Sequence, residues 1–144
     1  MAKYRSGSHT LSRLTVHVVW VTKYRYHVLT GEVQKRSRSL IIQDCESLDI
    51  EILKGVVSKD HVHIHIEYPP KLSVSEIMKQ VKGRSSRLLQ KEFPHLKKRY
   101  WGQRFWAKGF GAWSTGNITD EMVQEYLEHH RKPTDNSQDN FLLE

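Results

Sequence analysis

The sequence lacks the features that would place the chain in a membrane or in an oxidising compartment. Its 144 residues contain a single cysteine, Cys45, so no intrachain disulfide can form and no C-x-x-C pair suggests a structural zinc site. Residues 1–10 are polar and basic, and no segment approaches the roughly 20 apolar residues that a membrane span needs. We therefore expect a soluble, unexported protein of the cytoplasm with no membrane partner.

The sequence also lacks any G-x-x-x-x-G-K-[ST] phosphate loop, internal repeat or second domain. It has an excess of positive charge, because 23 Lys and Arg residues outnumber 16 Asp and Glu residues and give a net charge of +7. This balance favours nucleic acid as a partner over an anionic membrane surface, since no basic amphipathic anchor helix is present. We expect an N-terminal extension over residues 1–11, one domain over 12–132 and a C-terminal tail over 133–144.

The distribution of apolar residues predicts four strands and three helices. Strands are expected where β-branched and aromatic residues alternate with others, over residues 14–22, 49–58, 61–68 and 109–115. Helices are expected where apolar residues recur at helical spacing, over residues 30–48, 73 to about 94 and 119–132. The order βαββαβ predicts a ferredoxin-like α+β fold, an antiparallel sheet with helices on one face and the other face open. The C-terminal helix would carry Tyr126.

The third predicted strand is rich in histidine. Because side chains alternate along a strand, the residues His61, His63, His65 and Glu67 share one face, and the apolar residues between them face the helices. His61 and His63 lie about 6.6 Å apart along such a strand, a spacing at which two imidazoles can bind one divalent cation. The alternative is an exposed polar strand face that happens to use histidine. Two histidines cannot complete a coordination sphere, so a metal site requires a third ligand.

The last predicted helix offers a nucleophile and a third ligand together. Tyr126 and His130 are four residues apart and therefore share a helix face, so a metal held by His130 would sit near the phenol oxygen. The alternative is that Tyr126 is a half-buried member of an apolar stripe that includes Val123 and Leu127.

Cationic side chains are candidates for DNA contacts in two segments, the second predicted helix and the connector that follows it. They are Lys79, Lys82, Arg84 and Arg87 in the helix, and Lys97, Lys98, Arg99 and Arg104 in the connector. In the connector they alternate with aromatic residues such as Trp101 and Trp106, a combination that binds single strands by charge and base stacking. The alternative is a solvated helix end followed by two core tryptophans.

An ordered set of short motifs resembles a known family. The segments are HVVWVTKYR at residues 17–25, DHVHI at 60–64, KGRSS at 82–86, GNIT at 116–119 and YLE at 126–128. Together they are similar to the small single-tyrosine HUH transposases of simple insertion sequences, the insertion sequence 200/605 type. The resemblance covers about residues 12–132. His130 is a departure, because the family commonly has glutamine four residues after the tyrosine.

The resemblance implies a homodimer that binds hairpins of single-stranded DNA at the ends of an insertion sequence. It implies a divalent metal ion, Mg²⁺ or Mn²⁺, held by His61 and His63, with His130 in the place of the third ligand. It also implies that Tyr126 attacks the scissile phosphate and keeps the 5′ phosphate. In that family the tyrosine helix of one subunit often completes the histidine site of the other. His65 and Glu67 are not part of the motif, and we assign them no catalytic role.

Two other functions are compatible with the same residues. A replication-initiation or conjugative HUH nuclease uses similar chemistry, although such proteins are generally larger. A non-catalytic ferredoxin-like nucleic-acid-binding module would need stacking aromatic residues on its central strands, where this sequence has histidines.

Overall fold

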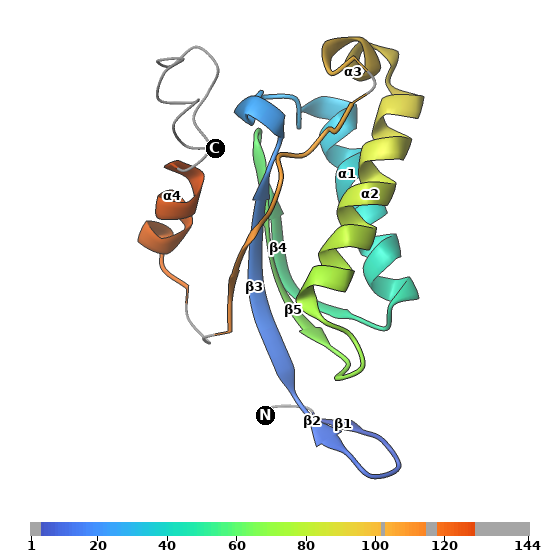
Figure 1. Cartoon of the computed structure of the whole chain (residues 1–144), viewed down its shortest axis with the longest axis vertical. Helices are drawn as coiled ribbons and strands as arrows, with labels where there is room; N and C mark the ends of the chain where they lie inside the picture. Colours follow the sequence, from blue (N-terminus) through green and yellow to red (C-terminus); the bar gives the residue numbers. More distant parts are fainter. Residues whose placement is uncertain (1–3, 102, 115–117, 129–144) are drawn as a thin grey trace.

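A computed structural model describes residues 4–101, 103–114 and 118–128. In this part of the chain the strands are β1 (Arg5–Ser6), β2 (Leu11–Ser12), β3 (Leu14–Val21), β4 (Glu51–Val57), β5 (His61–Tyr68) and β6 (Gly111–Trp113). The helices are the 3-10 turn η1 (Lys23–Arg25), α1 (Gly31–Ser47), α2 (Val74–Glu92), α3 (Pro94–Arg99) and α4 (Asp120–Glu128). Figure 1 shows the main sheet with α1 and α2 on one side and α4 on the other.

The main sheet is antiparallel and has the order β4-β5-β3-β6. The long central strands β3 and β5 pair without interruption from Leu14 opposite Tyr68 to Val21 opposite His61. The short strand β6 adds to the outer edge of β3. With α1 between β3 and β4 and α2 between β5 and β6, this order confirms the predicted ferredoxin-like α+β fold.

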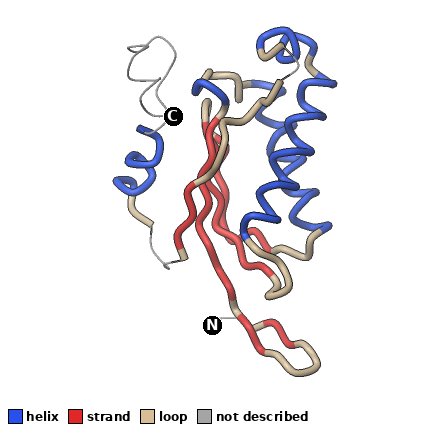
Figure 2. The backbone as a smooth tube through the Cα atoms, viewed as in Figure 1, coloured by secondary structure: helices blue, strands red, loops and turns tan. Residues whose placement is uncertain are grey.

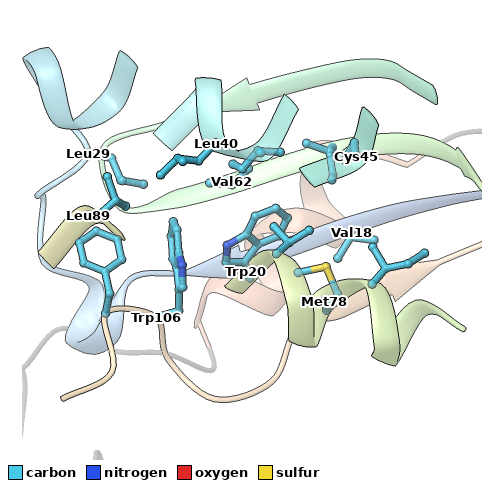
Figure 3. Close-up of a cluster of buried hydrophobic side chains, with 14 of the residues drawn as sticks. Val18, Trp20, Leu29, Leu40, Cys45, Val62, Met78, Leu89 and Trp106 are labelled. Carbon is cyan, nitrogen blue, oxygen red and sulfur yellow. The ribbon is translucent and has the colours of Figure 1, made fainter. Parts of the chain in front are cut away.

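The helices α1 and α2 bury one face of the sheet. Even-numbered residues of β3, among them Val18 and Trp20, pack with Val62 of β5 into a core that Figure 3 shows in close-up. Helix α2 begins with a capping box, in which the Ser73 hydroxyl accepts from the Glu76 amide and the Glu76 carboxylate accepts from the Ser73 amide. These two hydrogen bonds explain why the helix starts where it does.

The only cysteine of the sequence lies in this core. Cys45 of α1 is 1% exposed, and its side chain is drawn among the core residues in Figure 3. Burial, together with the neighbouring Asp44 carboxylate, raises the pKa of its thiol to about 12. The thiol is therefore protonated at physiological pH.

The second face of the sheet is not open as predicted. Helix α4 packs on it, and Leu127 forms a small apolar cluster with Val19 and Val21 of β3. Thr119 begins α4 as predicted, because its hydroxyl accepts from the Met122 amide. The prediction was wrong because Val19 and Val21, on the second face of β3, were not recognised as the packing surface for the apolar residues of the last helix. Figure 2 shows α4 and the two long helices on opposite sides of the strands.

Two further segments differ from the expected elements. Residues 94–99 of the connector form the helix α3, with Pro94 in the first turn, where a missing amide hydrogen costs nothing. Near the N-terminus, β1 and β2 form a hairpin that extends beyond the end of the main sheet (Figure 1). Within the described residues, no helix is both long enough and apolar enough to cross a membrane.

Candidate functional site

The second face of the sheet carries a cluster of imidazoles, of which His61, His63 and His65 were predicted. His17 of β3 joins them, because it lies directly opposite His65 in the sheet register. The His17 and His65 rings stack with centroids 3.8 Å apart, and His17 Nδ1 lies 3.2 Å from His63 Nε2. His17 was not among the predicted metal ligands. Its position between the core residues Val16 and Val18 was the available signal, since alternation places it on the opposite face.

Burial keeps the central imidazoles neutral. It lowers the pKa of His63, and the positive charges that His17 and His61 would carry lower it further. The pKa of His65 is lowered in the same way, by burial and then by His17 and Arg13. A neutral imidazole presents a lone pair, which is the form that binds a metal ion.

His61 is held by a neighbouring carboxylate. Its Nδ1 lies 2.8 Å from Asp60 Oδ1, and the other Asp60 oxygen accepts from Arg25 Nε at 3.1 Å. Burial alone would raise the pKa of Asp60, but the hydrogen bond from His61 and the charge of Arg25 outweigh it and lower the pKa to about 2. Because a carboxylate can only accept, His61 Nδ1 carries the proton and the Nε2 lone pair is left for a ligand.

Glu67, on the same strand as the histidines, has a different partner. Its side chain is 5% exposed, and its Oε2 accepts from Arg5 Nε at 2.7 Å. A second nitrogen of Arg5 donates to Asp49, so one arginine ties the N-terminal hairpin to two points of the domain. The ion pair with Arg5 accounts for a buried carboxylate among the imidazoles, so a catalytic role is not needed to explain it.

Tyr126 is half-buried on α4, over the same face as the histidines. Val19 and Val21, which pack with α4, are the cross-strand partners of His63 and His61. The Tyr126 ring meets Trp113 of β6 edge to face, with centroids 6.5 Å apart. Burial raises the pKa of Tyr126 to about 12, so the phenol is neutral at physiological pH.

Gly111 of β6 makes room for this tyrosine. A Cβ atom at position 111 would lie 3.0 Å from Tyr126 Cδ1 and 2.6 Å from Trp113 Cη2. Contacts that short require the rings to move, so only glycine permits the observed approach.

Among the residues that the structure describes, no group of three or more His, Cys, Asp or Glu side chains is arranged to hold a metal ion. The proposed third ligand, His130, lies outside the described residues, as does the Gly116-Asn117 part of the GNIT motif. The donor set nevertheless fits a divalent metal ion, because His61 and His63 are neighbouring imidazoles and Asp60 fixes the tautomer of the first.

Seven cationic side chains line a cavity of about 1090 Å³ between α2 and the segment that leads to β6. We call this cavity the basic groove. Five of the lining residues are predicted DNA contacts, and Lys91 and Lys108 are additional: Lys79, Lys82, Arg87, Lys91, Lys97, Arg104 and Lys108. Met78, Trp106 and Phe110 contribute apolar surface.

Lys82 is the most constrained cation of the basic groove. Its Nζ donates to the carbonyl oxygens of Ala107 and Gly109, at 2.8 and 2.7 Å. Burial, followed by the nearby charge of Arg104, lowers the pKa of Lys82 to about 8. This lysine therefore titrates close to physiological pH.

Three of the predicted DNA contacts lie elsewhere. Lys98 and Arg99 belong to α3 and do not line the basic groove, and the Arg99 guanidinium lies 4.2 Å from the centre of the Tyr26 ring. Arg84 lies on the side of α2 that faces α1, where its Nη1 donates to Asp44 at 2.8 Å. Asp44 is 2% exposed, and its burial raises its pKa although Arg84 partly offsets the shift.

The two tryptophans of the connector have opposite environments. Trp106 is 2% exposed, and its indole nitrogen donates to Ser85 Oγ of α2 at 2.8 Å. Trp101 is 87% exposed. Trp106 is thus a core residue that borders the basic groove, whereas Trp101 presents its ring to solvent.

Solved structures of similar fold include transposases. A candidate transposase from Deinococcus radiodurans R1 superposes with a TM-score of 0.82 at 27% identity, covering 89% of this chain and 98% of that one. A REP-associated tyrosine transposase bound to a REP hairpin shares the fold at 19% identity, with a TM-score of 0.53 over 90% of this chain and 68% of that one. The fold is therefore that of a class of DNA transposases.

The sequence comparisons narrow the class to a family. The family model described as "Transposase IS200 like" matches residues 10–130. The transposase for insertion sequence element IS200 of Salmonella typhimurium strain LT2 is 34% identical over 129 residues, which are 90% of this chain and 84% of that protein. The chain belongs to the family of IS200-like transposases, which confirms the resemblance seen in its motifs. It is accordingly an enzyme of a class that acts on DNA.

Proposed function

We propose that this transposase cleaves and rejoins single-stranded DNA at insertion-sequence ends, with Tyr126 as its nucleophile and a divalent metal ion as its cofactor. One observation carries the proposal. Helix α4, which includes Tyr126, packs on the sheet face that carries His61 and His63, and does so through the valines paired with those histidines. The candidate nucleophile and the candidate metal ligands are therefore presented on one face.

The chemistry begins at the phenol of Tyr126. Its oxygen forms a bond to the scissile phosphorus while the bond from phosphorus to the 3′ oxygen breaks, which gives a 5′-phosphotyrosine and a 3′ hydroxyl. The linkage conserves the energy of the cleaved bond, so a 3′ hydroxyl can reverse the attack and join new ends without nucleotide hydrolysis. This fits the lack of a phosphate loop in the sequence.

Because the pKa of Tyr126 is raised to about 12, deprotonation requires help from the surroundings. His61 would hold the cofactor through Nε2, with His63 as the second ligand and His130 as the third. Bound Mg²⁺ or Mn²⁺ would supply positive charge beside the phosphate and favour the phenolate.

The basic groove is the proposed binding surface for the DNA backbone. Lysines and arginines of α2, α3 and the segment before β6 converge there, and the partly exposed ring of Phe110 lies beside them. Cations flanked by aromatic surface suit a nucleic-acid strand. We further propose that the protein acts as a homodimer in the cytoplasm, on hairpins formed by the element ends.

The decisive experiment is incubation with labelled single-stranded hairpins of an element end and Mg²⁺ or Mn²⁺. We expect a covalent protein-DNA adduct that resists denaturation. Tyr126→Phe should abolish the adduct and leave hairpin binding within a few fold, since only one oxygen is removed. The matched control is Tyr4→Phe, which alters an exposed tyrosine of the N-terminal hairpin and should change nothing. Adduct formation by Tyr126→Phe at the wild-type rate would overturn the assignment.

The ligand roles require separate variants. His61→Ala and His63→Ala should remove metal-dependent cleavage, and His130→Ala should weaken it less severely. His130→Gln should recover much of the activity with a shift towards Mg²⁺, because the carboxamide oxygen is a harder donor than imidazole nitrogen. His129→Ala is the control for His130→Ala. Full activity of His130→Ala together with inactivity of His129→Ala would refute the assignment of His130, rather than His129, as the third ligand.

A further inference from the structure

The turn that follows β3 holds an arginine in an unusual backbone conformation. Tyr24 and Arg25 are consecutive non-glycine residues with φ of +62° and +54°. This left-handed region is strained for an L-residue, so it persists only where the surroundings enforce it. Here the Arg25 amide donates to the Thr22 carbonyl, and the Thr22 hydroxyl donates to the carbonyl of Tyr26. The turn is thus fixed at both of its ends.

The Arg25 side chain joins two parts of the candidate site. Its Nε donates to Asp60 Oδ2 at 3.1 Å, and its Nη1 donates to the backbone carbonyl of Leu127 at 3.0 Å. Asp60 in turn accepts from His61 Nδ1 at 2.8 Å through its other oxygen. Leu127 directly follows Tyr126 on α4. A continuous chain of hydrogen bonds therefore runs from the helix of the nucleophile through Arg25 and Asp60 to a metal-ligand candidate.

We propose that Arg25 is a positioning residue that couples the docking of α4, and with it Tyr126, to the orientation of the His61 imidazole. The proposal rests on the proposed function for its catalytic meaning. Its structural basis is that the Arg25 guanidinium donates to the Leu127 carbonyl of α4 and to the Asp60 carboxylate at the same time. A change at one acceptor therefore affects the position of the other.

The geometry explains why this position carries arginine. A guanidinium is a planar fork whose separate N–H groups can point at two acceptors in fixed directions, whereas an ammonium group is a compact point charge. Lysine at position 25 would keep the positive charge next to Asp60 but would not bond to Asp60 and Leu127 with the same geometry. Arg25→Lys therefore tests the link separately from the charge.

The first measurement is amide hydrogen exchange of the metal-free protein. Arg25→Lys should accelerate exchange of the α4 amides by at least about 10-fold, the factor expected when a charged hydrogen bond is lost. Exchange in α2 should stay at the wild-type rate, which shows that the fold is intact. The matched control is Arg36→Lys, which alters a two-pronged pair with Glu92 between α1 and α2 and should leave α4 unchanged.

The second measurement is the ¹⁵N chemical shift of the His61 ring, again without metal. In the wild type the shifts should report a proton on Nδ1, and Arg25→Lys should move them towards a mixture of the two tautomers. The reciprocal variant is Asp60→Asn. The described hydrogen bonds link Asp60 to α4 only through Arg25, so faster exchange of the α4 amides in this variant would show that the effect passes through Arg25. If the two ends are coupled, a change at Arg25 must affect the His61 ring and a change at Asp60 must affect α4.

The outcomes separate the coupling from the proposed function. Acceleration of α4 exchange beyond any change in α2 in both variants, together with a changed His61 tautomer in Arg25→Lys, supports the coupling. If exchange in α4 changes no more than exchange in α2 in either variant, or if the His61 ring is unchanged in Arg25→Lys, the coupling is overturned. Lack of a covalent adduct with the wild-type protein would overturn the proposed function alone, since neither measurement depends on metal or DNA.

Discussion

Replacing Asp60 with asparagine should destabilise the fold by about 2–3 kcal/mol at neutral pH. The pKa of Asp60 falls from its usual 3.8 to about 2 in the folded protein, because the hydrogen bond from His61 and the charge of Arg25 outweigh the effect of burial. Each unit corresponds to about 1.36 kcal/mol, which gives the stated magnitude. The Asp60 side chain is only 9% exposed, so solvent screens its interactions with Arg25 and His61 less than at the surface.

The sign of the pH dependence follows from the lowered pKa. The unfolded chain binds this proton more readily, so the stabilisation is fully present above about pH 4 and is lost as pH falls through about 2. At about pH 3, roughly half of this stabilisation should remain. The difference in stability between the wild type and Asp60→Asn should therefore shrink as the solution is acidified.

Urea unfolding of both proteins between about pH 7 and pH 3, followed by circular dichroism, measures this difference directly. Asp49→Asn is the control, because Asp49 also pairs with an arginine but its side chain is 80% exposed. That variant should lose less than about 1 kcal/mol at any pH in the range. An equal loss at pH 7 and pH 3 for Asp60→Asn would show that packing rather than charge is responsible and would refute the reasoning.

Three further predictions concern the basic groove and the helices beside it. Hairpin binding, measured by fluorescence anisotropy at fixed salt, should weaken as pH rises through and above 8, because Lys82 has a pKa of about 8 and only its protonated form would make the proposed phosphate contact. Lys82→Gln should remove that dependence, and persistence of the dependence would exclude Lys82 as its source. Arg84→Ala should destabilise the protein by about 3 kcal/mol in urea, because the buried Asp44 loses its partner, while hairpin binding changes little. Trp106→Ala should cost about 3–5 kcal/mol and Trp101→Ala less than about 0.5, and similar losses for both would contradict their assigned burial.

The fold was predictable because its signals are local. The strand β5 is found at residues 61–68 as expected, since polar and apolar side chains alternate along it from His61 to Glu67. The capping box at Ser73 likewise lies within four residues of sequence. Helix α3 was not predicted, because a run of lysine and arginine after Pro94 gives no apolar period to detect.

The candidate site was predictable only in part, because several of its contacts depend on register. His63 and His65 stand out as a pattern along one strand, but His17 comes close to them only through the pairing of β3 with β5. Arg84 belongs to a basic segment of the sequence, yet its guanidinium pairs with a buried carboxylate 40 positions away. Contacts of this kind require the tertiary structure.

The buried thiol of Cys45 makes the molecule convenient for spectroscopy. It is the only cysteine in the sequence, it is 1% exposed, and its thiolate form is suppressed by a pKa of about 12. Maleimide reagents attack exposed thiolates, so the natural chain should resist labelling under native conditions. A cysteine introduced on the surface of α4 would then carry a dye or spin label without background from the parent protein. Pairing it with a second label on α1 would report the distance between the two sides of the sheet as DNA binds.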